Sequence, residues 1–353
     1  MSKKKPTIID IAHATGLSKS LVSRALAGKA GVGEESRTRI LETADRLGYK
    51  RNTWATSLVK GSSHMIGVIA TDIASTYRLE VITGVEDAAA EAGYTALLAH
   101  GRRDPEVLAE RLAQMHSLGV DGVVVVSSRM PSGPLSAVAR STPIVIVGRP
   151  AEAPVGVDLI HNDDETGGAL ATQHLIDIGH TRIGFVASSQ RAAIRAREQA
   201  WRDTLAAAGL SDDFLLRRQN EEDLAQRTMN ELVLSDDPPT ALVASTDGLA
   251  AAIVGAAQDR GLVVPDDLAV VGYNNSSLST QLRPQLTTVD QPRHEMGKLA
   301  VEMILERLAG RTTDRVTVAE PRLVVRDSSS TSVPATPTTV HRDANNAPAT
   351  PSG

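Results

Sequence analysis

Downstream of Met65 the chain alternates short apolar runs with longer amphipathic segments. The amphipathic segments are predicted to be helices and cover 78–92, 104–118, 166–178, 197–208 and 246–260. The apolar runs have the length of buried strands and read MIGVIA, YTALLAH, GVVVV, PIVIVG, RIGFVA, ALVAS and LAVVGY. Such alternation is typical of parallel sheets covered on both faces. Because roughly 260 residues exceed one doubly wound sheet, we predict an α/β body of two Rossmann-like lobes with a ligand cleft at the carboxyl ends of the strands.

The first fifty residues have a helical pattern instead, which predicts an all-α head of three short helices. Thr7 and Asp10 have the T-x-x-D spacing of a helix N-cap, and the first helix is expected to end near Gly16. The second helix covers about 18–26 and the third about 34–47. The apolar positions expected to face the core are Ile8, Ile9, Ile11, Ala12, Leu21, Val22, Ala25, Leu26, Ile40, Leu41, Ala44 and Leu47.

Charge separates the head from the rest of the chain. Residues 1–60 hold 12 Lys and Arg against 5 Asp and Glu, whereas the whole chain has a net charge of −5. A basic head on an acidic body favours a polyanionic partner for the head alone. A solvated charged face is the alternative interpretation, and charge by itself does not decide between the two.

Composition excludes several classes of site. The 353 residues include no cysteine, so disulfides, Cys-ligated zinc, iron–sulfur clusters and thiol nucleophiles are excluded. No apolar signal segment or 18-residue apolar window occurs, and we expect a cytoplasmic protein. The Ser/Thr/Pro-rich stretch 328–353 has few apolar side chains, and we expect it to form a disordered tail.

The second helix of the head has the surface of a DNA reader. Its outward positions are Lys19, Ser20, Ser23 and Arg24, and a turn at Gly16 precedes it, as in a helix-turn-helix whose second helix enters the major groove. Arg24 and Lys19 can donate to guanine, and Ser20 can bond several base edges. The caps Thr7 and Ser18 can bond phosphates. A purely structural three-helix module has the same pattern and remains an alternative.

Enzyme signatures are weak in this sequence. The run GKAGVG at 28–33 follows a helix rather than a strand, and no P-loop lysine motif is present. The acidic run HNDDE at 161–165 precedes a helix, where carboxylates complement the helix dipole more simply than they bind a metal. His174 and His180 have no nucleophile elbow to serve. We therefore predict no catalytic residue, no metal site and no cofactor.

Several ordered motifs resemble one known family. TIIDIAHATGLSKSLVSRAL and SRTRILETADRLGYKRN are similar to the DNA-binding head of the lactose/galactose repressor family of bacterial transcription regulators. DDETGGALATQHLIDIGHTRIGFV, VPDDLAVVGYNN and RPQLTTVDQPRHEMGKLA resemble its effector-binding core, so the likeness runs from Thr7 to Arg326. The resemblance implies a homodimeric repressor on a near-palindromic operator. Its two lobes would resemble periplasmic sugar-binding proteins, and the small effector in their cleft would be a sugar or sugar derivative, often a sugar phosphate.

The resemblance also assigns residues of the head. Lys19, Ser20 and Arg24 would read bases, and Thr7, Ser18 and Ser23 would lie near phosphates. The segment RNTWATSLVKG would be a hinge helix, with Asn52 near its start and Leu58 inserted into the minor groove, at a central CG step that deforms easily. Alternatively the segment is an amphipathic linker. Arg51 replaces the usual proline there, and Trp54 has no role that we can assign.

In the body the resemblance implies effector contacts at Tyr77, Arg197, Asp247 and Asn274. A guanidinium can donate several hydrogen bonds to hydroxyls, a carboxylate or a phosphate. Asn274 stands where aspartate is common, which allows a more anionic ligand. Alternatives remain open for the other three, since Arg197 fits a surface helix, Asp247 fits a helix cap and Tyr77 fits ordinary packing.

Three further candidates lie near predicted strand ends, namely Ser127, Arg149 and Asp163. The glycine usual three residues after the family arginine is replaced by Ala200. We expect a head over 1–50, a hinge over 51–62, one lobe from 63–161 with 291–320, and another from 162–290 with 321–327.

Two other functional classes stay open from the sequence. A solute-binding protein without a DNA role would share the cleft, and a sugar-modifying enzyme would need a base and phosphate loop that we do not find. The sequence leaves open whether the effector is an inducer or a corepressor, and whether the protein is a dimer or a tetramer.

Overall fold

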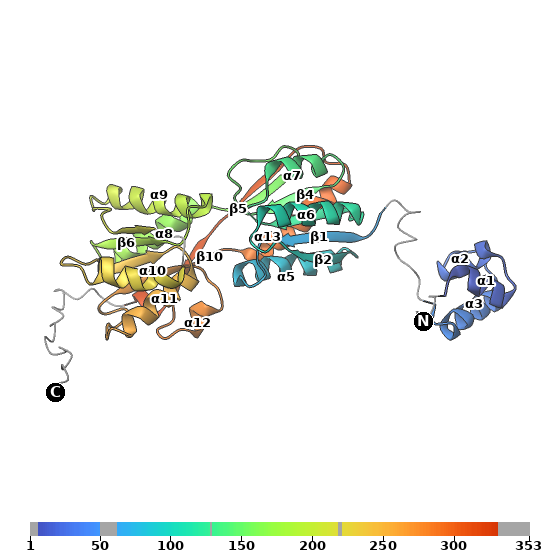
Figure 1. Ribbon diagram of the computed structural model, residues 1–353, viewed down its shortest axis with the longest axis horizontal. Helices are drawn as coiled ribbons and strands as arrows, with labels where there is room; N and C mark the ends of the chain where they lie inside the picture. The colour runs from blue at the N-terminus through green and yellow to red at the C-terminus, as the bar shows by residue number, and fades with distance from the viewer. Residues whose placement is uncertain (1–5, 50–61, 128, 218–220, 331–353) are drawn as a thin grey trace, which may run out of the picture. The chain divides into compact units, whose positions relative to one another are not determined.

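The computed structural model describes residues 6–49, 62–127, 129–217 and 221–330 (Figure 1). The chain divides into two compact units, the head up to Ser63 and the body from His64 onward. The head has one hydrophobic core of its own, and the body has four buried clusters.

The described part of the head consists of three helices, α1 (Ile8–Thr15), α2 (Lys19–Leu26) and α3 (Glu34–Arg46). The Thr7 side chain accepts from the amide of Asp10, and the Asp10 carboxylate accepts from the amide of Thr7. This capping box fixes the start of α1. Gly16 ends α1 with a φ of 66°, in the left-handed region that favours glycine. The three predicted helices are therefore confirmed.

The core of the head is smaller than the apolar pattern predicted. Its buried residues are Ile11, Val22, Ala25, Val32, Ile40 and Ala44. Ile9, Leu41 and Leu47 were expected to face it, but their side chains are 60%, 48% and 38% exposed. A short three-helix unit covers only one stripe of each helix, so apolar residues at the margin of that stripe stay in contact with water.

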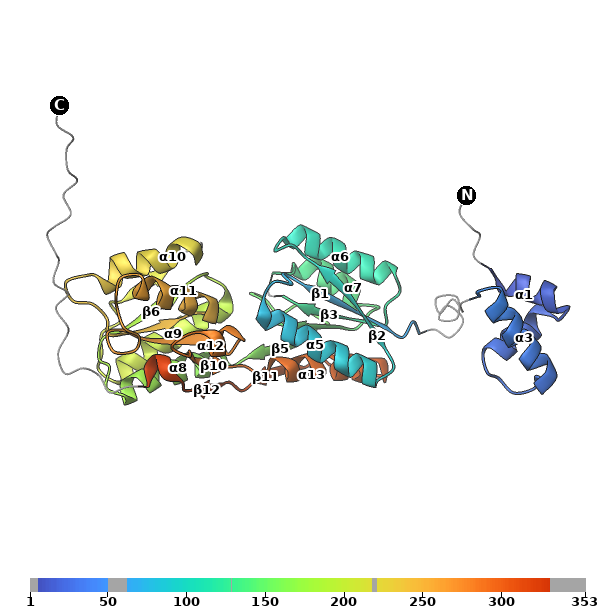
Figure 2. The same ribbon diagram turned by 90° about the horizontal axis from the view of Figure 1, so that it is seen from below.

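The first lobe of the body is built on six parallel strands in the order β11-β5-β4-β3-β1-β2. These strands are β1 (Met65–Ala70), β2 (Thr95–His100), β3 (Gly122–Val126), β4 (Ile144–Val147), β5 (Asp158–Asn162) and β11 (Val316–Ala319). One face is covered by α5 (Thr76–Glu91) and α13 (Arg293–Leu308), and the other by α6 (Pro105–Ser117) and α7 (Ser132–Ala139) (Figures 1 and 2).

The second lobe has a sheet in the order β12-β10-β9-β8-β6-β7, in which only the β10–β12 pair is antiparallel among the described strands. Its strands are β6 (Ile183–Ala187), β7 (Leu215–Arg217), β8 (Ala241–Ala244), β9 (Ala269–Asn274), β10 (Thr287–Asp290) and β12 (Arg322–Val324). Its helices are α8 (Asp164–Asp177), α9 (Ala192–Ala207), α10 (Glu221–Thr228), η1 (Met229–Val233), α11 (Asp247–Gln258), α12 (Leu278–Gln281) and η2 (Asp327–Ser329).

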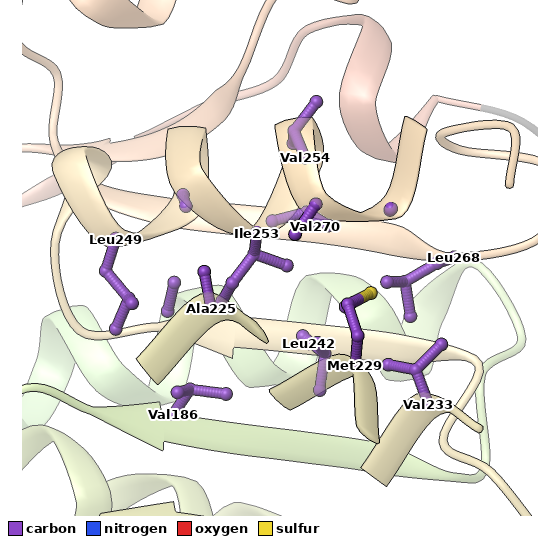
Figure 3. Close-up of a cluster of buried hydrophobic side chains, with 14 of the residues drawn as sticks. Val186, Ala225, Met229, Val233, Leu242, Leu249, Ile253, Val254, Leu268 and Val270 are labelled. Atoms are coloured by element: carbon purple, nitrogen blue, oxygen red, sulfur yellow. The ribbon is translucent and has the colours of Figure 1, made fainter. Parts of the chain in front are cut away.

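Clusters of buried apolar side chains pack helices against both faces of this second sheet. Figure 3 shows Leu249 and Ile253 of α11 and Met229 of η1 gathered with Leu242 and Val270 of the sheet. On the opposite face α8 and α9 pack against the same strands. The predicted architecture, a helical head with two Rossmann-like lobes, is confirmed, and each of the seven predicted strands is present.

The chain passes between the lobes three times, from β5 to α8, from β10 to α13 and from β11 to β12. Arg293, the first residue of α13, joins the lobes at this crossing. Its guanidinium donates to the Glu80 carboxylate at 2.7 Å and to the Asn275 carbonyl at 3.0 Å. The apolar pattern did not predict β5 or β10, because both strands mix apolar residues with Thr, Asp, His or Asn.

The disordered tail was predicted to begin at residue 328, but the ordered second lobe extends beyond that position. Ser328 and Ser329 are buried in η2, where Ser328 Oγ donates to the Val270 carbonyl at 2.6 Å and Ser329 Oγ donates to Thr287 at 2.7 Å. These hydroxyls satisfy polar groups of the second lobe, so residues 328–330 belong to it. The rest of the expected tail, 331–353, lies outside the described residues. None of the described helices is long and apolar enough to cross a membrane.

Candidate functional site

The exposed face of α2 is polar and cationic. Lys19, Ser20, Ser23 and Arg24 are all exposed, while Val22 and Ala25 of the same helix are buried in the head core. Ser18 caps the helix, its Oγ accepting from the amide of Leu21 at 3.2 Å. The helix-turn-helix pattern of the sequence thus appears as an α1–turn–α2 unit with one exposed polar face.

Arg24 also makes a hydrogen bond within the head. Its guanidinium donates to the carbonyl of Ala30 at 2.7 Å, in the loop that follows α2. Two other head arginines hold backbone in the same way, Arg37 at the carbonyl of Lys29 and Arg39 at that of Thr15. The expected hinge contacts Asn52 and Leu58, together with Arg51 and Trp54, lie outside the described residues.

A cleft of about 1030 Å³ lies between the two lobes of the body. Its lining includes residues that directly follow strands of both sheets, such as Thr71 after β1, Ser127 after β3 and Ser188 after β6. Parallel strands end at a common edge of each sheet, so the residues after them collect in one place. The cleft is therefore at the predicted position.

Arg197 of α9 forms the best ordered cluster in the cleft. Two of its nitrogens lie 2.8 Å from Asp164 Oδ1, a third donates to the Ser245 carbonyl at 2.9 Å, and the guanidinium lies 3.5 Å from the centre of the Tyr273 ring. Burial lowers the pKa of Arg197, but the Asp164 carboxylate outweighs it and leaves the pKa above its ordinary value. Arg197 is thus a buried, permanently charged residue rather than a surface arginine.

Two adjacent glycines of α8 make room for this cluster. A Cβ at Gly167 would lie 2.0 Å from the Tyr273 hydroxyl, and one at Gly168 would lie 2.6 Å from the Arg197 carbonyl. Both positions therefore exclude a side chain unless the neighbours move. The GG pair in the sequence DETGGALA places Arg197 and Tyr273 against α8.

Asp247 lines the cleft at the start of α11, but its carboxylate already has partners. Oδ2 accepts from the amide of Ser276 at 2.6 Å, and Oδ1 accepts from the Thr288 hydroxyl at 2.5 Å. The cap of α11 is Thr246, so Asp247 is not the helix cap that the sequence allowed. Burial raises the pKa of Asp247 against the lowering effect of these hydrogen bonds.

A chain of amides joins the two lobes beside the cleft. Asn274 Oδ1 accepts from Gln291 Nε2 at 2.6 Å, and Gln291 Oε1 in turn accepts from Asn162. Asn162 also donates to the Tyr77 hydroxyl at 3.2 Å. Tyr77 and Asn274 therefore contribute to one polar network from opposite lobes. Asn274 has a φ of 118°, a strained backbone at the edge of the site.

A model of the description "Bacterial regulatory proteins, lacI family" matches residues 7–52, and one of a "Periplasmic binding protein-like domain" matches residues 172–329. The HTH-type transcriptional repressor PurR of Photobacterium profundum is 32% identical over 328 residues, which span 91% of this chain and 98% of that relative. The chain belongs to the lacI family of bacterial regulatory proteins.

Solved structures give the same fold. The lac repressor dimer bound to operator and the anti-inducer ONPF has a TM-score of 0.81 at 22% identity, covering 92% of this chain and 99% of that one. A complex of the transcriptional regulator CelR with cellobiose has a TM-score of 0.68 at 29% identity, with the same two coverages. This lacI-family chain is a DNA-binding transcriptional repressor controlled by a small-molecule effector, and not an enzyme.

The remaining expected effector residues of this lacI-family chain lie at different depths. Ser127 is buried in the cleft wall, where it bonds the Thr71 hydroxyl and accepts from the amide of Arg129 at 3.0 Å. Arg149 lines the cleft and bonds Glu165 through two nitrogens, at 2.8 and 2.9 Å. Asp163 is absent from the lining and caps α8 by accepting from the amide of Thr166.

Sequence reasoning missed several residues that line the cleft. These are Arg78, Arg103, Arg129, Asn162, Asp164 and Ser276. Asp164 adjoins the Asp163 that was named, but the order of two aspartates does not tell which one caps a helix and which one turns inward. Asn162 and Ser276 each end or follow a strand, which is a signal that could have found them. No group of three metal-ligating side chains occurs within the described part of this lacI-family chain.

Proposed function

We propose that this repressor is a cytoplasmic homodimer that reads a near-palindromic operator through the exposed face of α2. Lys19, Ser20 and Arg24 would contact base edges, and Thr7, Ser18 and Ser23 the phosphates. The observation that carries the proposal is the exposed polar and cationic face of α2, a helix that Ser18 caps and whose opposite face packs in the head core. The hinge would run over 51–62, with Asn52 near the DNA backbone and Leu58 unstacking a central CG step.

The cleft would take a sugar or sugar derivative as effector. The residues that line it include Tyr77, Ser127, Arg149, Arg197, Asp247 and Asn274. The similar transcriptional regulator CelR forms a complex with cellobiose. The lobes that form the cleft would be 63–161 with 291–320, and 162–290 with 321–330, since Ser328 and Ser329 bond the second lobe. Asp163 would act on the effector only indirectly, by fixing the start of α8.

The proposed coupling is a two-state change in lobe closure. The amide chain Asn162–Gln291–Asn274 and the Arg293 contacts both cross between lobes, so a ligand that prefers one closure must rearrange or strengthen them. In a dimer such a change would alter the spacing of the hinges and hence operator affinity.

The test is selection by the full-length protein from a pool of randomised palindromes with a central CG step, at two salt concentrations. We expect one palindrome to be enriched, with Kd then measured by fluorescence anisotropy. Arg24→Ala should weaken it about tenfold or more and relax one base position. Leu58→Ala should weaken binding, because alanine is too small to separate the two base pairs of the central step.

Two further variants make the test specific. Arg24 also donates to the Ala30 carbonyl, so Arg24→Ala could weaken DNA binding by changing the head itself. The Lys19 side chain makes no hydrogen bond within the described residues, so Lys19→Ala tests the exposed face of α2 without this effect. Arg46→Ala removes the same charge from α3 and should keep the enriched sequence unchanged. Absence of enrichment at either salt would contradict DNA reading by the head and favour a solute-binding role.

A further inference from the structure

The loop between α2 and α3 holds the side chain of Arg24. The Arg24 guanidinium donates through Nη2 to the carbonyl of Ala30 at 2.7 Å. Within the described residues this side chain makes no other hydrogen bond and no ion pair. Arginine is a donor through all three of its nitrogens, so the N–H groups on Nε and Nη1 remain available to a ligand.

The accepting carbonyl belongs to a segment of the loop that is anchored at both ends. Before it, the Lys29 carbonyl accepts from Arg37 of α3 at 2.8 Å, and the Lys29 amide donates to the carbonyl of Arg24 at 3.0 Å. After it, Val32 is buried in the head core. The Ala30 carbonyl therefore has a defined position relative to α2.

Gly31 leaves the space that the guanidinium occupies. A Cβ at Gly31 would lie 2.4 Å from Nη2 of Arg24 and 3.5 Å from its Cζ, so a side chain at this position would overlap the guanidinium. Gly31 has a φ of 82°, and Gly28 in the same loop has a φ of 68°. A Cβ at Gly28 would meet no atom within 4 Å. The two glycines have similar backbone conformations, but of the two only Gly31 lies against Arg24.

A side chain that is fixed before binding reads bases better than a mobile one. A free arginine side chain samples many rotamers, and fixing one of them at an interface costs conformational entropy. The contact of arginine with guanine is bidentate and depends on where its N–H donors lie, whereas attraction to phosphates depends mainly on charge. Displacing the guanidinium should therefore lower discrimination between bases more than it lowers overall affinity.

We propose that Gly31 is a positioning residue for DNA recognition, because its missing side chain lets the Ala30 carbonyl hold Arg24 in the conformation that meets a base edge. The inference deepens the proposed function and rests on the role given there to Arg24. Gly31 acts through Arg24 and not through a contact of its own with a base. The loop after the recognition helix thus sets how well that helix discriminates between bases.

The direct test is Gly31→Ala in the full-length protein, with Gly28→Ala as the matched control. Either substitution places an alanine at positive φ in the same loop, so both variants carry a similar backbone strain and should lose similar amounts in Tm. In Gly31→Ala the new methyl group also overlaps the guanidinium of Arg24, the flexible group that can move aside. The two variants should therefore differ in the position of Arg24.

Base discrimination is measured by fluorescence anisotropy with the enriched palindrome and its single-base variants. At the base whose preference is lost in Arg24→Ala, Gly31→Ala should lower the ratio of Kd values about fivefold or more, while Gly28→Ala retains it. An unchanged or higher ratio in Gly31→Ala would overturn the proposal, and a higher one would mean that the loop withdraws Arg24 from DNA. An equal loss in both glycine variants would assign the effect to backbone strain and overturn it as well.

A double-mutant cycle separates positioning from a general effect on the head. When Arg24 is already replaced by alanine, Gly31→Ala should change affinity and discrimination no more than Gly28→Ala does, because the side chain that Gly31 positions is absent. A loss of the same size in the presence and in the absence of the Arg24 side chain would contradict a role through Arg24.

The order of the Arg24 side chain is also measured without DNA. NMR relaxation of its Nε–H group, assigned by the loss of that signal in Arg24→Lys, reports motion of the guanidinium. The side chain should be ordered in the wild-type protein and in Gly28→Ala, and mobile in Gly31→Ala. A mobile Arg24 in the wild-type protein would contradict the proposal.

The proposed function and this inference fail in different ways. Operator enrichment with equal discrimination in the two glycine variants would retain DNA reading by α2 and reject positioning by Gly31. An ordered Arg24 that becomes mobile in Gly31→Ala, without operator enrichment by the wild-type protein, would retain the contact with the loop and reject base reading, and with it the positioning role.

Discussion

Arg197 illustrates how burial limits what a charged side chain can offer a ligand. The side chain is 8% exposed, and its nitrogens are engaged by Asp164 and by the Ser245 carbonyl. An anion brought to it would compete with a carboxylate already in place, and displacing that carboxylate would leave Asp164 buried without its cation. Arg78 forms no hydrogen bond or ion pair with a described residue, and Asp72 acts on it only through its charge, so the two arginines have different chemistry despite sharing one cleft.

His180 gives the body a measurable pH dependence. Burial, with a smaller effect of His174, lowers the pKa of His180 to about 4, and its Nδ1 lies 2.8 Å from the Thr240 hydroxyl. An unfolded histidine has a pKa of about 6.5, so between these values the unfolded chain binds a proton that the folded chain does not. The free energy of unfolding should therefore fall by about 3 kcal/mol as the pH drops from about 6.5 to 4.

Urea unfolding at a series of pH values measures this loss. His180→Gln should make the dependence shallower by up to one proton over that interval, and His116→Gln, which removes an exposed imidazole of the first lobe, is the matched control. An unchanged slope in His180→Gln would assign the acid sensitivity to other groups.

At the scale of elements, α5 and α13 approach so closely that backbone touches backbone. A Cβ at Gly84 would lie 2.0 Å from the carbonyl oxygen of His294, and one at Gly297 would lie 2.1 Å from that of Val81. This contact matters for function because α5 carries Arg78 and α13 carries Arg293. The spacing of the two helices therefore sets the position of a cleft residue and of a contact between lobes.

Gly84→Ala should lower the free energy of unfolding by about 1–3 kcal/mol, since a carbonyl oxygen in a packed helix cannot move aside as a side chain can. Chemical denaturation of the full-length protein measures the change. Gly255→Ala in α11 is the control, because the new methyl group meets no atom within 4 Å. It should stabilise the protein by up to about 1 kcal/mol through helix propensity. Equal effects of the two substitutions would contradict the close contact.

At the scale of the whole molecule, the head and the body are separate contact units with separate cores. Truncating a buried side chain in the head should therefore leave the stability of the body unchanged, and the reverse should also hold. Ile40 of α3 and Ile69 of β1 are both completely buried, which makes them a matched pair.

Ile40→Ala should cost about 2–5 kcal/mol in a head that is small enough to be marginally stable, and so should abolish operator binding. The calorimetric transition of the body and its effector affinity should stay unchanged. Ile69→Ala should lower the body transition and leave the unfolding of the head unaltered. A shift of both transitions by either variant would show that the units are thermodynamically coupled.

The sequence predicted elements wherever periodicity and capping are local properties. The T-x-x-D cap of α1, the glycine that ends it and the apolar stripe of α2 depend on residues within a few positions of each other. The seven buried strands have apolar runs that need no partner to be recognised. The pattern was less informative for β5 and β10, whose buried polar side chains have partners that are distant in the chain. Asp158 of β5 accepts from Arg307 and Arg311, and Thr288 of β10 donates to Asp247.

The body site was only partly accessible from sequence. Six of the seven expected effector residues line the cleft. Tyr77, Arg197, Asp247 and Asn274 were expected from the family resemblance, whereas Ser127 and Arg149 were expected because they lie near predicted strand ends. Arg78, Arg103 and Arg129 are far apart in the chain and look like ordinary surface arginines. The chemical role of each guanidinium depends on which charged groups lie near it in space, and the order of residues in the sequence does not give those distances.

The sequence by itself thus determined the helical head, the two α/β lobes and the position of the cleft, since these follow from hydrophobic period and from where parallel strands end. Only the tertiary structure decided which charges are compensated. It paired Arg197 with Asp164 and Arg103 with Asp72, and it left Arg78 without an ion pair to any described residue. Coulomb interactions fall with separation in space, so residues distant in the chain acquire their chemical roles only when the fold brings them together.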